Sequence, residues 1–117
     1  MRYTTLPHTD IKVSKICLGT MTWGNQNTQD EGFAQMDLAV DKGVNFFDVA
    51  ELYPVPATAE TYAETERIIG NWFEKTGKRD QIVLATKIAG PGDYTAHIRT
   101  NGFSKDALND AVNNRLT

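Results

Sequence analysis

Short apolar runs alternate with segments of helical spacing along most of the chain. Three mostly apolar runs have the length of buried strands, and they are residues 16–18, 44–49 and 81–87. After each run, apolar residues recur every three or four positions, which is typical of a helix with one buried face. The residues expected to point inward are Phe33, Met36, Ala39 and Val40, then Ile68, Ile69, Trp72 and Phe73, and finally Leu108, Ala111, Val112 and Leu116.

Residues that cap helices mark the helix boundaries. Thr28 with Glu31, and Thr61 with Glu64, have the spacing of a capping box, in which a hydroxyl and a later carboxylate satisfy free backbone donors. Ser104 is expected to cap a third helix. The glycines expected to end the first two helices are Gly43 and Gly77. The pattern therefore predicts helices that begin near these three capping positions.

The N-terminal residues follow a different pattern. Residues 2–6 and 11–14 are compatible with strands and flank the turn-forming segment 7–10, which predicts a β-hairpin. Three units of strand, loop and helix follow the hairpin. Strands that alternate with amphipathic helices predict an α/β fold with a parallel sheet and right-handed crossovers. The third helix is followed by no further strand, so the outer edge of the last strand is left uncovered.

The composition is that of a globular protein, and it limits the classes of partner that the protein is expected to bind. The chain has 117 residues, of which 40% are hydrophobic, 9% aromatic and 23% charged, which excludes disordered, collagen-like and disulfide-rich classes. A formal net charge of −3 and the lack of a basic cluster argue against nucleic acid and anionic membranes as partners. The chain has no apolar leader and no apolar run of about 20 residues, and Cys17 is its single cysteine, so we predict a cytoplasmic protein.

Residues with useful chemistry lie where the predicted strands end. In a parallel sheet the carboxyl ends of the strands meet at one edge, and ligands bind there. Asp48, Tyr53 and Lys87 all lie at or after strand ends, so a carboxylate, a phenol and an amine are expected at the same edge. A nearby ammonium favours the phenolate form of a phenol and makes the phenol a better proton donor. The carboxylate would hold the ammonium charged and oriented.

Each of these residues also has a purely structural explanation. Asp48 would suit a loop cap, Tyr53 a packing aromatic, and Lys87 a solvated strand end. Their joint placement at one edge of the sheet favours a functional role.

Three motifs at the strand ends resemble the N-terminal half of an aldo-keto reductase. They are Gly-Thr-Met-Thr-Trp-Gly at 19–24, Asp-Val-Ala-Glu-Leu-Tyr at 48–53 and Ala-Thr-Lys at 85–87. The opening hairpin and the run Gly-Val-Asn-Phe-Phe-Asp at 43–48 fit the same family. Tyr-Pro-Val-Pro at 53–56 is similar to the bacterial Tas-like members and to relatives of the potassium-channel β subunit. The resemblance covers essentially the whole chain.

This resemblance implies an NADPH-dependent reductase of aldehydes and ketones on a (β/α)8 TIM barrel, of which residues 1–117 would form the N-terminal hairpin and about the first three βα units. It implies that Tyr53 is the general acid that protonates the carbonyl oxygen, that Lys87 assists it, and that Asp48 pairs with Lys87. The residues near the nicotinamide and its ribose would be Thr20, Met21, Gln26 and Asp48. Trp23 would border the substrate pocket together with Tyr53, and a role in covering the barrel rim is an equal alternative.

Other features depart from the family's pattern. The family completes its catalytic set with a histidine after the fourth strand, and its later strands hold the cofactor phosphates. The chain of 117 residues is about half or less of a barrel of roughly 250 residues, so we expect it to be inactive alone.

Arg99 and Lys105 are expected to be solvated rather than phosphate-binding. His8 and His97 lack metal-ligand spacing, so no metal site is predicted.

Two other functions stay open at this point. The chain would act as a structural or interaction module if its uncovered sheet edge pairs with another chain, including a second copy. A small open-sheet α/β domain that binds another nucleotide is a further alternative, in which the constellation of Asp48, Tyr53 and Lys87 would be a coincidence.

Overall fold

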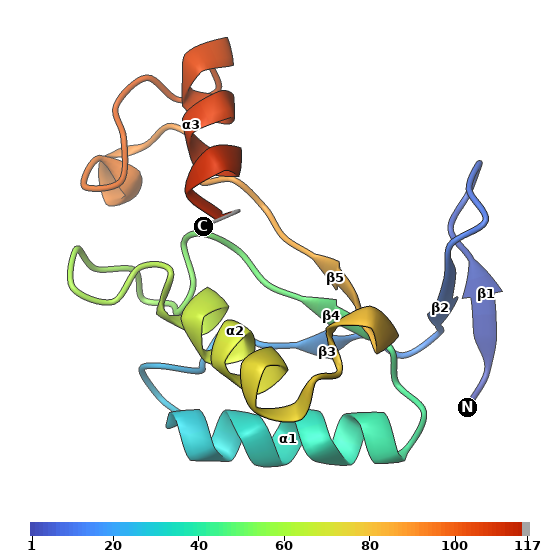
Figure 1. Cartoon of the computed structure of the whole chain (residues 1–117). Helices are drawn as coiled ribbons and strands as arrows, with labels where there is room; N and C mark the ends of the chain where they lie inside the picture. Colours follow the sequence, from blue (N-terminus) through green and yellow to red (C-terminus); the bar gives the residue numbers. More distant parts are fainter. Residues whose placement is uncertain (116–117) are drawn as a thin grey trace.

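Five short strands and three α-helices form the computed structural model, which describes residues 1–115 (Figure 1). The strands are β1 (Tyr3–Thr5), β2 (Lys12–Ser14), β3 (Leu18–Gly19), β4 (Phe46–Asp48) and β5 (Val83–Ala85). The α-helices are α1 (Gln29–Asp41), α2 (Glu64–Thr76) and α3 (Lys105–Arg115), and the short 3-10 helices are η1 (Arg79–Gln81) and η2 (Asp93–Thr95). The predicted order of hairpin and strand–helix units is confirmed, and Leu116 lies outside the described residues.

The strands form two separate sheets. β1 and β2 form the predicted antiparallel hairpin, in which Thr4 lies opposite Val13. β3, β4 and β5 form the predicted parallel sheet, with β4 in the centre. Gly19, Asp48 and Ala85 lie side by side across this sheet. The register therefore brings the carboxyl ends of the three strands to one edge.

The strands are shorter than the apolar runs that predicted them. Ile16 lies before β3 and is 59% exposed, because no neighbouring strand or helix covers it. β5 begins only at Val83, since the preceding residues form η1. The Arg79 side chain stabilises this 3-10 helix by donating to the Ile82 carbonyl at 3.0 Å. The local turn thus replaces the first part of the predicted strand.

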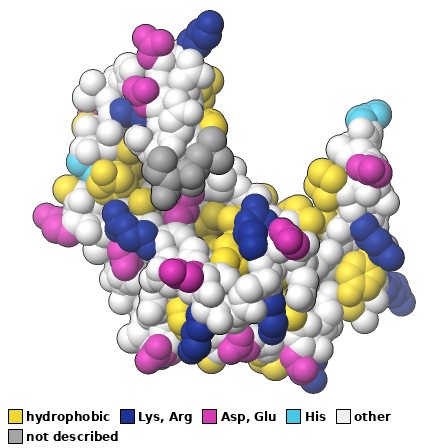
Figure 2. Space-filling view, viewed as in Figure 1, with side chains coloured by type: hydrophobic (Ala, Val, Ile, Leu, Met, Phe, Trp, Pro, Cys, Tyr) yellow, Lys and Arg dark blue, Asp and Glu magenta, His cyan; other side chains and the backbone are white. Residues whose placement is uncertain are grey.

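Within residues 1–115, helices cover one face of the parallel sheet. α1 and α2 pack against this face, and the opposite face is open, so that the molecule is hollowed between α3 and the hairpin (Figures 1 and 2). Phe47 is completely buried, whereas its neighbours Phe46 and Asp48 are half-buried. Adjacent residues of a strand point to opposite faces. The apolar run that predicted a buried strand is therefore buried on one face, and Asp48 lies on the open face.

The predicted inner faces of α1 and α2 form the core with the sheet. The buried core residues are Trp23, Met36, Val44, Phe47, Val49, Ile68, Ile69, Trp72 and Ile82. The Trp72 ring lies 5.9 Å from the Phe47 ring, and its indole N–H donates to the Asp37 carboxylate at 2.9 Å. Trp72 therefore joins α2 both to the sheet and to α1.

Thr28 caps α1 as predicted. Its hydroxyl accepts a hydrogen bond from the Glu31 amide at 3.2 Å, and the Glu31 carboxylate accepts one from the Thr28 amide at 2.8 Å. The second predicted capping box is wrong, because Ala63 is the N-cap of α2 and no side chain caps that helix. The Thr61 hydroxyl and amide instead contact the Thr58 hydroxyl at 2.7 and 3.1 Å, in a turn that precedes α2.

Replacing Thr28 by alanine is expected to lower the free energy of unfolding by about 1 kcal/mol, because a helix N-cap is lost. Thr61→Ala is the matched control, since Thr61 stands in the same sequence pattern without capping a helix. We expect the control to stay within about 0.5 kcal/mol of the unmodified chain. Urea denaturation followed by circular dichroism measures both variants. Equal losses in the two variants would contradict this assignment of the caps.

The third helix, α3, lies beyond the carboxyl edge of the sheet, next to the start of α2 and away from α1 (Figure 1). Ser104 caps it as predicted, because the Ala107 amide donates to the Ser104 hydroxyl at 3.2 Å. Ala111 is buried as expected, but Leu108 and Val112 are 37% and 49% exposed, so this part of the predicted inner face is wrong. The helix does not lie on the sheet, and it buries the small side chains of Ala107 and Ala111 instead.

Candidate active site

The loops that follow β4 and β5 place the predicted site residues at the carboxyl edge of the sheet. Asp48 is the last residue of β4, and Lys87 follows β5. Strand-like pairing continues past both strands: the Val49 amide donates to the Ala85 carbonyl, and the Glu51 amide donates to the Lys87 carbonyl, each at 2.9 Å. The two loops are therefore held together at the level of Lys87.

The structure brings the side chains of Asp48, Tyr53 and Lys87 together. The Lys87 ammonium donates to both carboxylate oxygens of Asp48 at 2.7 Å. The same ammonium lies over the Tyr53 ring, 5.0 Å from the ring centre. The side chains of Lys87 and Asp48 are 50% and 38% exposed, so a ligand can reach the pair from the open face of the sheet.

The surroundings of Lys87 raise its pKa above the usual value. Partial burial is the largest single influence and acts downward, but the hydrogen bond and charge of Asp48, together with Tyr53, outweigh it. Lys87 therefore keeps its charge throughout the neutral range. Because the folded pKa is raised, the stabilisation linked to this proton is fully present below the unfolded pKa of Lys87 and is lost as the pH rises through the folded value.

The residues predicted to lie near a nicotinamide differ in accessibility. The Thr20 side chain is 1% exposed, and its hydroxyl donates to the Asp48 carbonyl at 2.7 Å, so it supports the end of β4 from within. Met21 is 46% exposed, and its carbonyl accepts a hydrogen bond from the Val55 amide at 3.0 Å. Gln26 is exposed in the loop after β3. Met21, Gln26 and Asp48 are thus available to a ligand, whereas the Thr20 side chain is not.

The open face beside Asp48 is uncrowded at Gly19. Gly19 lies next to Asp48 in the sheet, and a side-chain carbon at Gly19 would meet no atom within 4 Å. A planar ligand can therefore approach the carboxylate across this glycine. The Met21 and Gln26 side chains are exposed as well.

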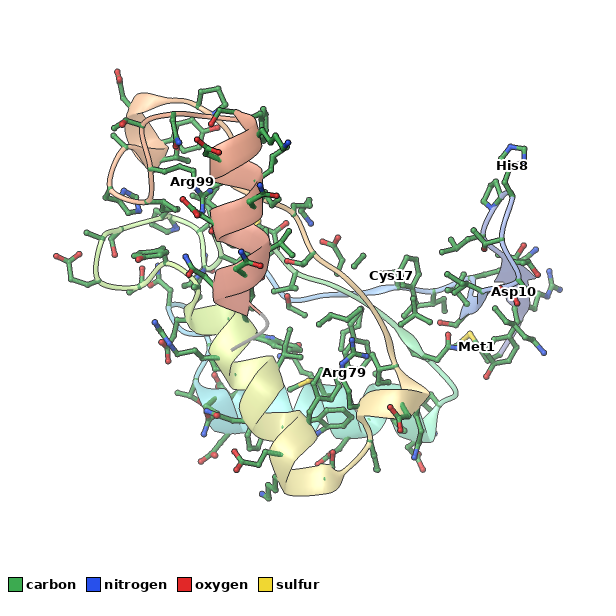
Figure 3. All side chains as sticks on the ribbon, turned by 45° about the horizontal axis from the view of Figure 1, so that its top comes forward. Met1, His8, Asp10, Cys17, Arg79 and Arg99 are labelled. Carbon is green, nitrogen blue, oxygen red and sulfur yellow. The ribbon has the colours of Figure 1, made fainter. Side chains whose placement is uncertain are left out.

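One hollow in the described part of the chain lies away from the predicted site residues. It has a volume of about 600 Å³ and lies between α2 and β5, where it is lined by residues that include Ile69, Phe73 and Leu84. Within residues 1–115, no three His, Cys, Asp or Glu side chains gather as a metal site requires. His8 lies at the tip of the hairpin (Figure 3). In the same described range, no helix is both long and apolar enough to cross a membrane.

Trp23 is a core residue in this structure. Its side chain is 1% exposed, and its indole N–H donates to the side-chain oxygen of Gln35 at 3.2 Å. It packs so closely on α1 that a side-chain carbon at Gly32 would lie 3.1 Å from its ring, and its carbonyl accepts the Thr65 hydroxyl at 2.6 Å. These contacts with α1 and α2 enclose Trp23, so it neither borders an open pocket nor covers a rim. We therefore leave it out of the proposed site.

Arg99 is not solvated, contrary to the prediction. Its guanidinium donates to both oxygens of the Glu51 carboxylate, and the two side chains are only 11% and 5% exposed. Lys105 is exposed, as expected. Sequence reasoning missed the pair because Glu51 and Arg99 lie in different loops, and no local spacing connects them. The one available signal was the position of Glu51 inside the motif that runs from Asp48 to Tyr53.

Cys17 lies close enough to Asp48 and Lys87 for their charges to shift the pKa of its thiol. The sequence did not predict this proximity. The side chain is exposed (Figure 3). Partial burial of the thiol raises its pKa, the Asp48 carboxylate raises it further, and the Lys87 ammonium lowers it, with a net upward shift. Alternation along the strand places Cys17 on the same face as Gly19, beside Asp48.

As the single cysteine, Cys17 is expected to report on this pair. It should react with Ellman's reagent at pH ~8 more slowly than glutathione, because the raised pKa reduces the fraction of reactive thiolate. Asp48→Asn is expected to speed the reaction and Lys87→Met to slow it, and stopped-flow absorbance measures both rates. An unchanged rate in Asp48→Asn would show that the carboxylate does not lie near the thiol.

The geometry of this site agrees with the comparisons with known proteins. The model of the aldo/keto reductase family matches residues 15–116. The chain belongs to the aldo-keto reductase family. Protein tas of Escherichia coli is 47% identical over 91 residues, and aldo-keto reductase YhdN of Bacillus subtilis is 33% identical over 94 residues. These matches cover 78% and 76% of this chain but 26% of each relative, so the chain spans about a quarter of their length.

Solved structures of aldo-keto reductases share the fold. The holo form of AKR11C1 from Bacillus halodurans superimposes with a TM-score of 0.72 at 26% identity, over 99% of this chain and 35% of that chain. The thermostable aldo-keto reductase Tm1743 gives a TM-score of 0.70 at 23% identity, over 99% of this chain and 38% of that chain. The predicted fold class, the N-terminal part of a (β/α)8 barrel, is confirmed. The open face of the sheet corresponds to the inside of such a barrel.

Proposed function

We propose that this aldo-keto reductase chain carries the proton-donating part of a site that reduces aldehydes and ketones with NADPH. The observation that supports the proposal is the position of Lys87, whose ammonium contacts both oxygens of Asp48 at 2.7 Å and lies 5.0 Å from the centre of the Tyr53 ring. A phenol beside a stable positive charge is suited to giving up its proton. The residues also lie at strand ends, where barrel enzymes place their active sites.

Tyr53 is the proton donor in this proposal. With a carbonyl compound beside it, the Tyr53 hydroxyl gives its proton to the carbonyl oxygen while the carbonyl carbon is reduced. Lys87 stabilises the phenolate that remains, and Asp48 keeps Lys87 charged and directed toward the ring. NADPH, when bound, supplies the hydride, and the product is an alcohol.

The accessible residues of the open face would hold the nicotinamide end of the cofactor. Met21, Gln26 and Asp48 would contact the nicotinamide and its ribose, and the ring would lie over Gly19. Thr20 would act indirectly, because its buried hydroxyl holds the Asp48 carbonyl. In the family, later strands hold the phosphates. We therefore expect no oxidation of NADPH when the purified 117-residue chain is mixed with 4-nitrobenzaldehyde.

A chimera with protein tas of Escherichia coli tests the proposal, because its 47% identity to this chain favours compatible packing. Residues 1–115 replace the matching segment of protein tas, and both proteins are assayed for NADPH oxidation with a panel of aromatic and aliphatic aldehydes. We expect the chimera to oxidise NADPH only when an aldehyde is present. A folded chimera that binds NADPH but reduces no aldehyde of the panel would overturn the proposal.

A second candidate, an interaction module, is favoured by the open sheet. Within the described residues, β5 pairs with β4 alone, and hydrophobic side chains line part of the hollow between α3 and the hairpin (Figure 2). Exposed sheet edges of this kind pair readily with other strands. Sedimentation velocity of the purified chain tests self-association. A monomer that does not bind a hydrophobic dye would argue against this function.

A further inference from the structure

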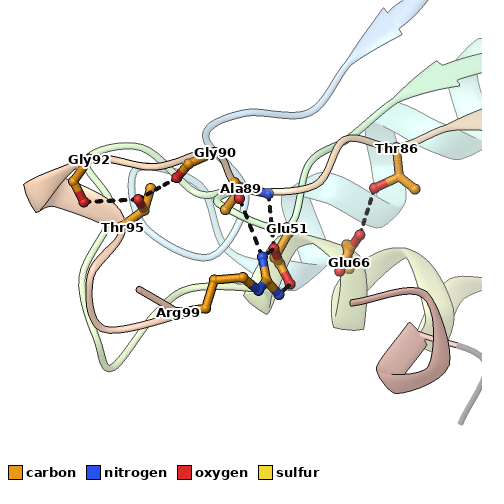
Figure 4. Close-up of polar contacts among 8 residues, drawn as sticks. All are labelled: Glu51, Glu66, Thr86, Ala89, Gly90, Gly92, Thr95 and Arg99. Carbon is orange, nitrogen blue, oxygen red and sulfur yellow. Dashed lines mark hydrogen bonds and ion pairs between the residues drawn. The ribbon is translucent and has the colours of Figure 1, made fainter. Parts of the chain in front are cut away.

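Glu51 and Arg99 form a buried ion pair beside the proposed active site (Figure 4). Both guanidinium nitrogens Nη1 and Nη2 donate to the carboxylate, one to each oxygen. The Ala89 amide donates to Glu51 Oε1 at 2.9 Å, and Arg99 Nη1 also donates to the Ala89 carbonyl at 3.3 Å. The three residues therefore form a closed ring of hydrogen bonds that connects the loop after β4 with the loop after β5.

The Glu51–Arg99 pair lies close in sequence to site residues in the loop after β4 and contacts the backbone that follows Lys87 in the loop after β5. Glu51 stands between Asp48 and Tyr53 in the sequence, and its amide donates to the Lys87 carbonyl at 2.9 Å. Ala89 follows Lys87 by two positions. These contacts hold the backbone at the Lys87 carbonyl and at Ala89 against the segment that leads to Tyr53.

We propose that Glu51 and Arg99 are positioning residues that set where the Lys87 ammonium lies relative to the Tyr53 ring. This inference rests on the proposed function. It extends that function by naming the residues that hold the proton donor Tyr53 and its charge partner Lys87 in place. Glu51 contacts the site through its backbone, since its amide donates to the Lys87 carbonyl. The two residues act through the backbone hydrogen bonds at Glu51 and Ala89.

The chemistry of the pair suits this role. Residues 86–92 after β5 contain two glycines and a proline and form no strand or helix, so the backbone there has little regular structure of its own. A bidentate arginine–carboxylate contact is directional as well as strong, which a lysine cannot reproduce. The hydrogen bonds to Glu51 raise the pKa of the Arg99 guanidinium, so Arg99 keeps its charge in the neutral range.

The test follows the position of Lys87 by NMR, since its ε-methylene protons should be shifted upfield by the Tyr53 ring beneath them. In Arg99→Lys and in Glu51→Gln, we expect most of this upfield shift to be lost. Arg67→Lys is the matched control, because Arg67 pairs with Glu64 at 2.9 Å on the exposed surface of α2, and the shift should be unchanged there. Tyr53→Leu gives the value without the ring.

Folded variants that keep the full upfield shift would overturn the proposal and leave the pair a purely structural one. Amide exchange in the unmodified chain is an independent measurement that does not depend on a variant folding. The Ala89 amide should exchange much more slowly than that of Tyr94, which is 62% exposed in the same loop. Equal rates at Ala89 and Tyr94 would equally overturn the proposal.

These readouts are separate from activity. If the chimera with protein tas reduces no aldehyde but the upfield shift depends on Arg99, the proposed function fails and the positioning contact stands. If the chimera is active and the shift is independent of Arg99, the positioning role fails and the proposed function stands.

Discussion

Replacing Tyr53 by phenylalanine in the chimera with protein tas is expected to lower kcat for aldehyde reduction by a factor of about 10² to 10⁴, which is the usual contribution of a positioned general acid. Phenylalanine keeps the ring over which Lys87 lies at 5.0 Å and removes only the hydroxyl. The ion pair of Lys87 with Asp48 should therefore persist. Steady-state kinetics with NADPH and a good aldehyde substrate, together with the dissociation constant for NADPH, measure the effect.

Tyr62→Phe is the matched control for this prediction. Tyr62 lies in the same loop, and its ring packs 5.6 Å from the His97 ring rather than against Lys87. We expect kcat to stay within about twofold of the parent in this variant, because the Tyr62 hydroxyl takes no part in the contacts of Lys87 with Asp48 and with the Tyr53 ring. A Tyr53→Phe chimera with the same kcat as the Tyr62→Phe chimera would show that Tyr53 is not the proton donor.

Replacing Trp72 by alanine is expected to lower the free energy of unfolding by about 3 to 5 kcal/mol, the range for large aromatic truncations in a core. Trp72 is completely buried, and it packs against Phe47 while its indole N–H donates to Asp37. Because small proteins are stable by only about 5 to 15 kcal/mol, the variant should lose most of its stability. Urea denaturation, followed by circular dichroism, measures the change.

Two further variants locate the source of this loss. Leu38→Ala on α1 is the control, since Leu38 is 59% exposed and its truncation should cost less than about 0.5 kcal/mol. Trp72→Phe keeps most of the ring contact but removes the donor to Asp37, so it should fall between the other two. A Trp72→Ala variant no less stable than Leu38→Ala would contradict the assignment of this core.

The meeting of Asp48, Tyr53 and Lys87 could be predicted from the sequence because it follows from topology. Parallel strands bring their carboxyl ends to one edge, so residues at or after successive strand ends become neighbours whatever the details of packing. The contacts of Lys87 with Asp48 and with the Tyr53 ring agree with that expectation. Their role in proton transfer stays a prediction that the kinetic experiments test.

The fate of individual side chains could not be predicted in the same way. Trp23 stands in a loop pattern that suggested a pocket wall, yet contacts from α1 and α2 bury it. Thr61 has the spacing of a helix cap, but its hydroxyl contacts Thr58. In both cases the sequence pattern was compatible with several contacts. For Trp23 the actual contacts come from distant helices, and for Thr61 they come from a competing local turn.

By itself, the sequence determined the order of the elements, the buried faces of α1 and α2, and the gathering of Asp48, Tyr53 and Lys87. Periodicity and the position of a residue at a strand end are local properties of the sequence. Parallel pairing of the strands then brings the residues at their ends close together. Only the tertiary structure decided that Arg99 is buried against Glu51 and that the face carrying Asp48 is open. The reason is that burial and loop-to-loop contacts depend on how distant segments pack, and no local spacing records that.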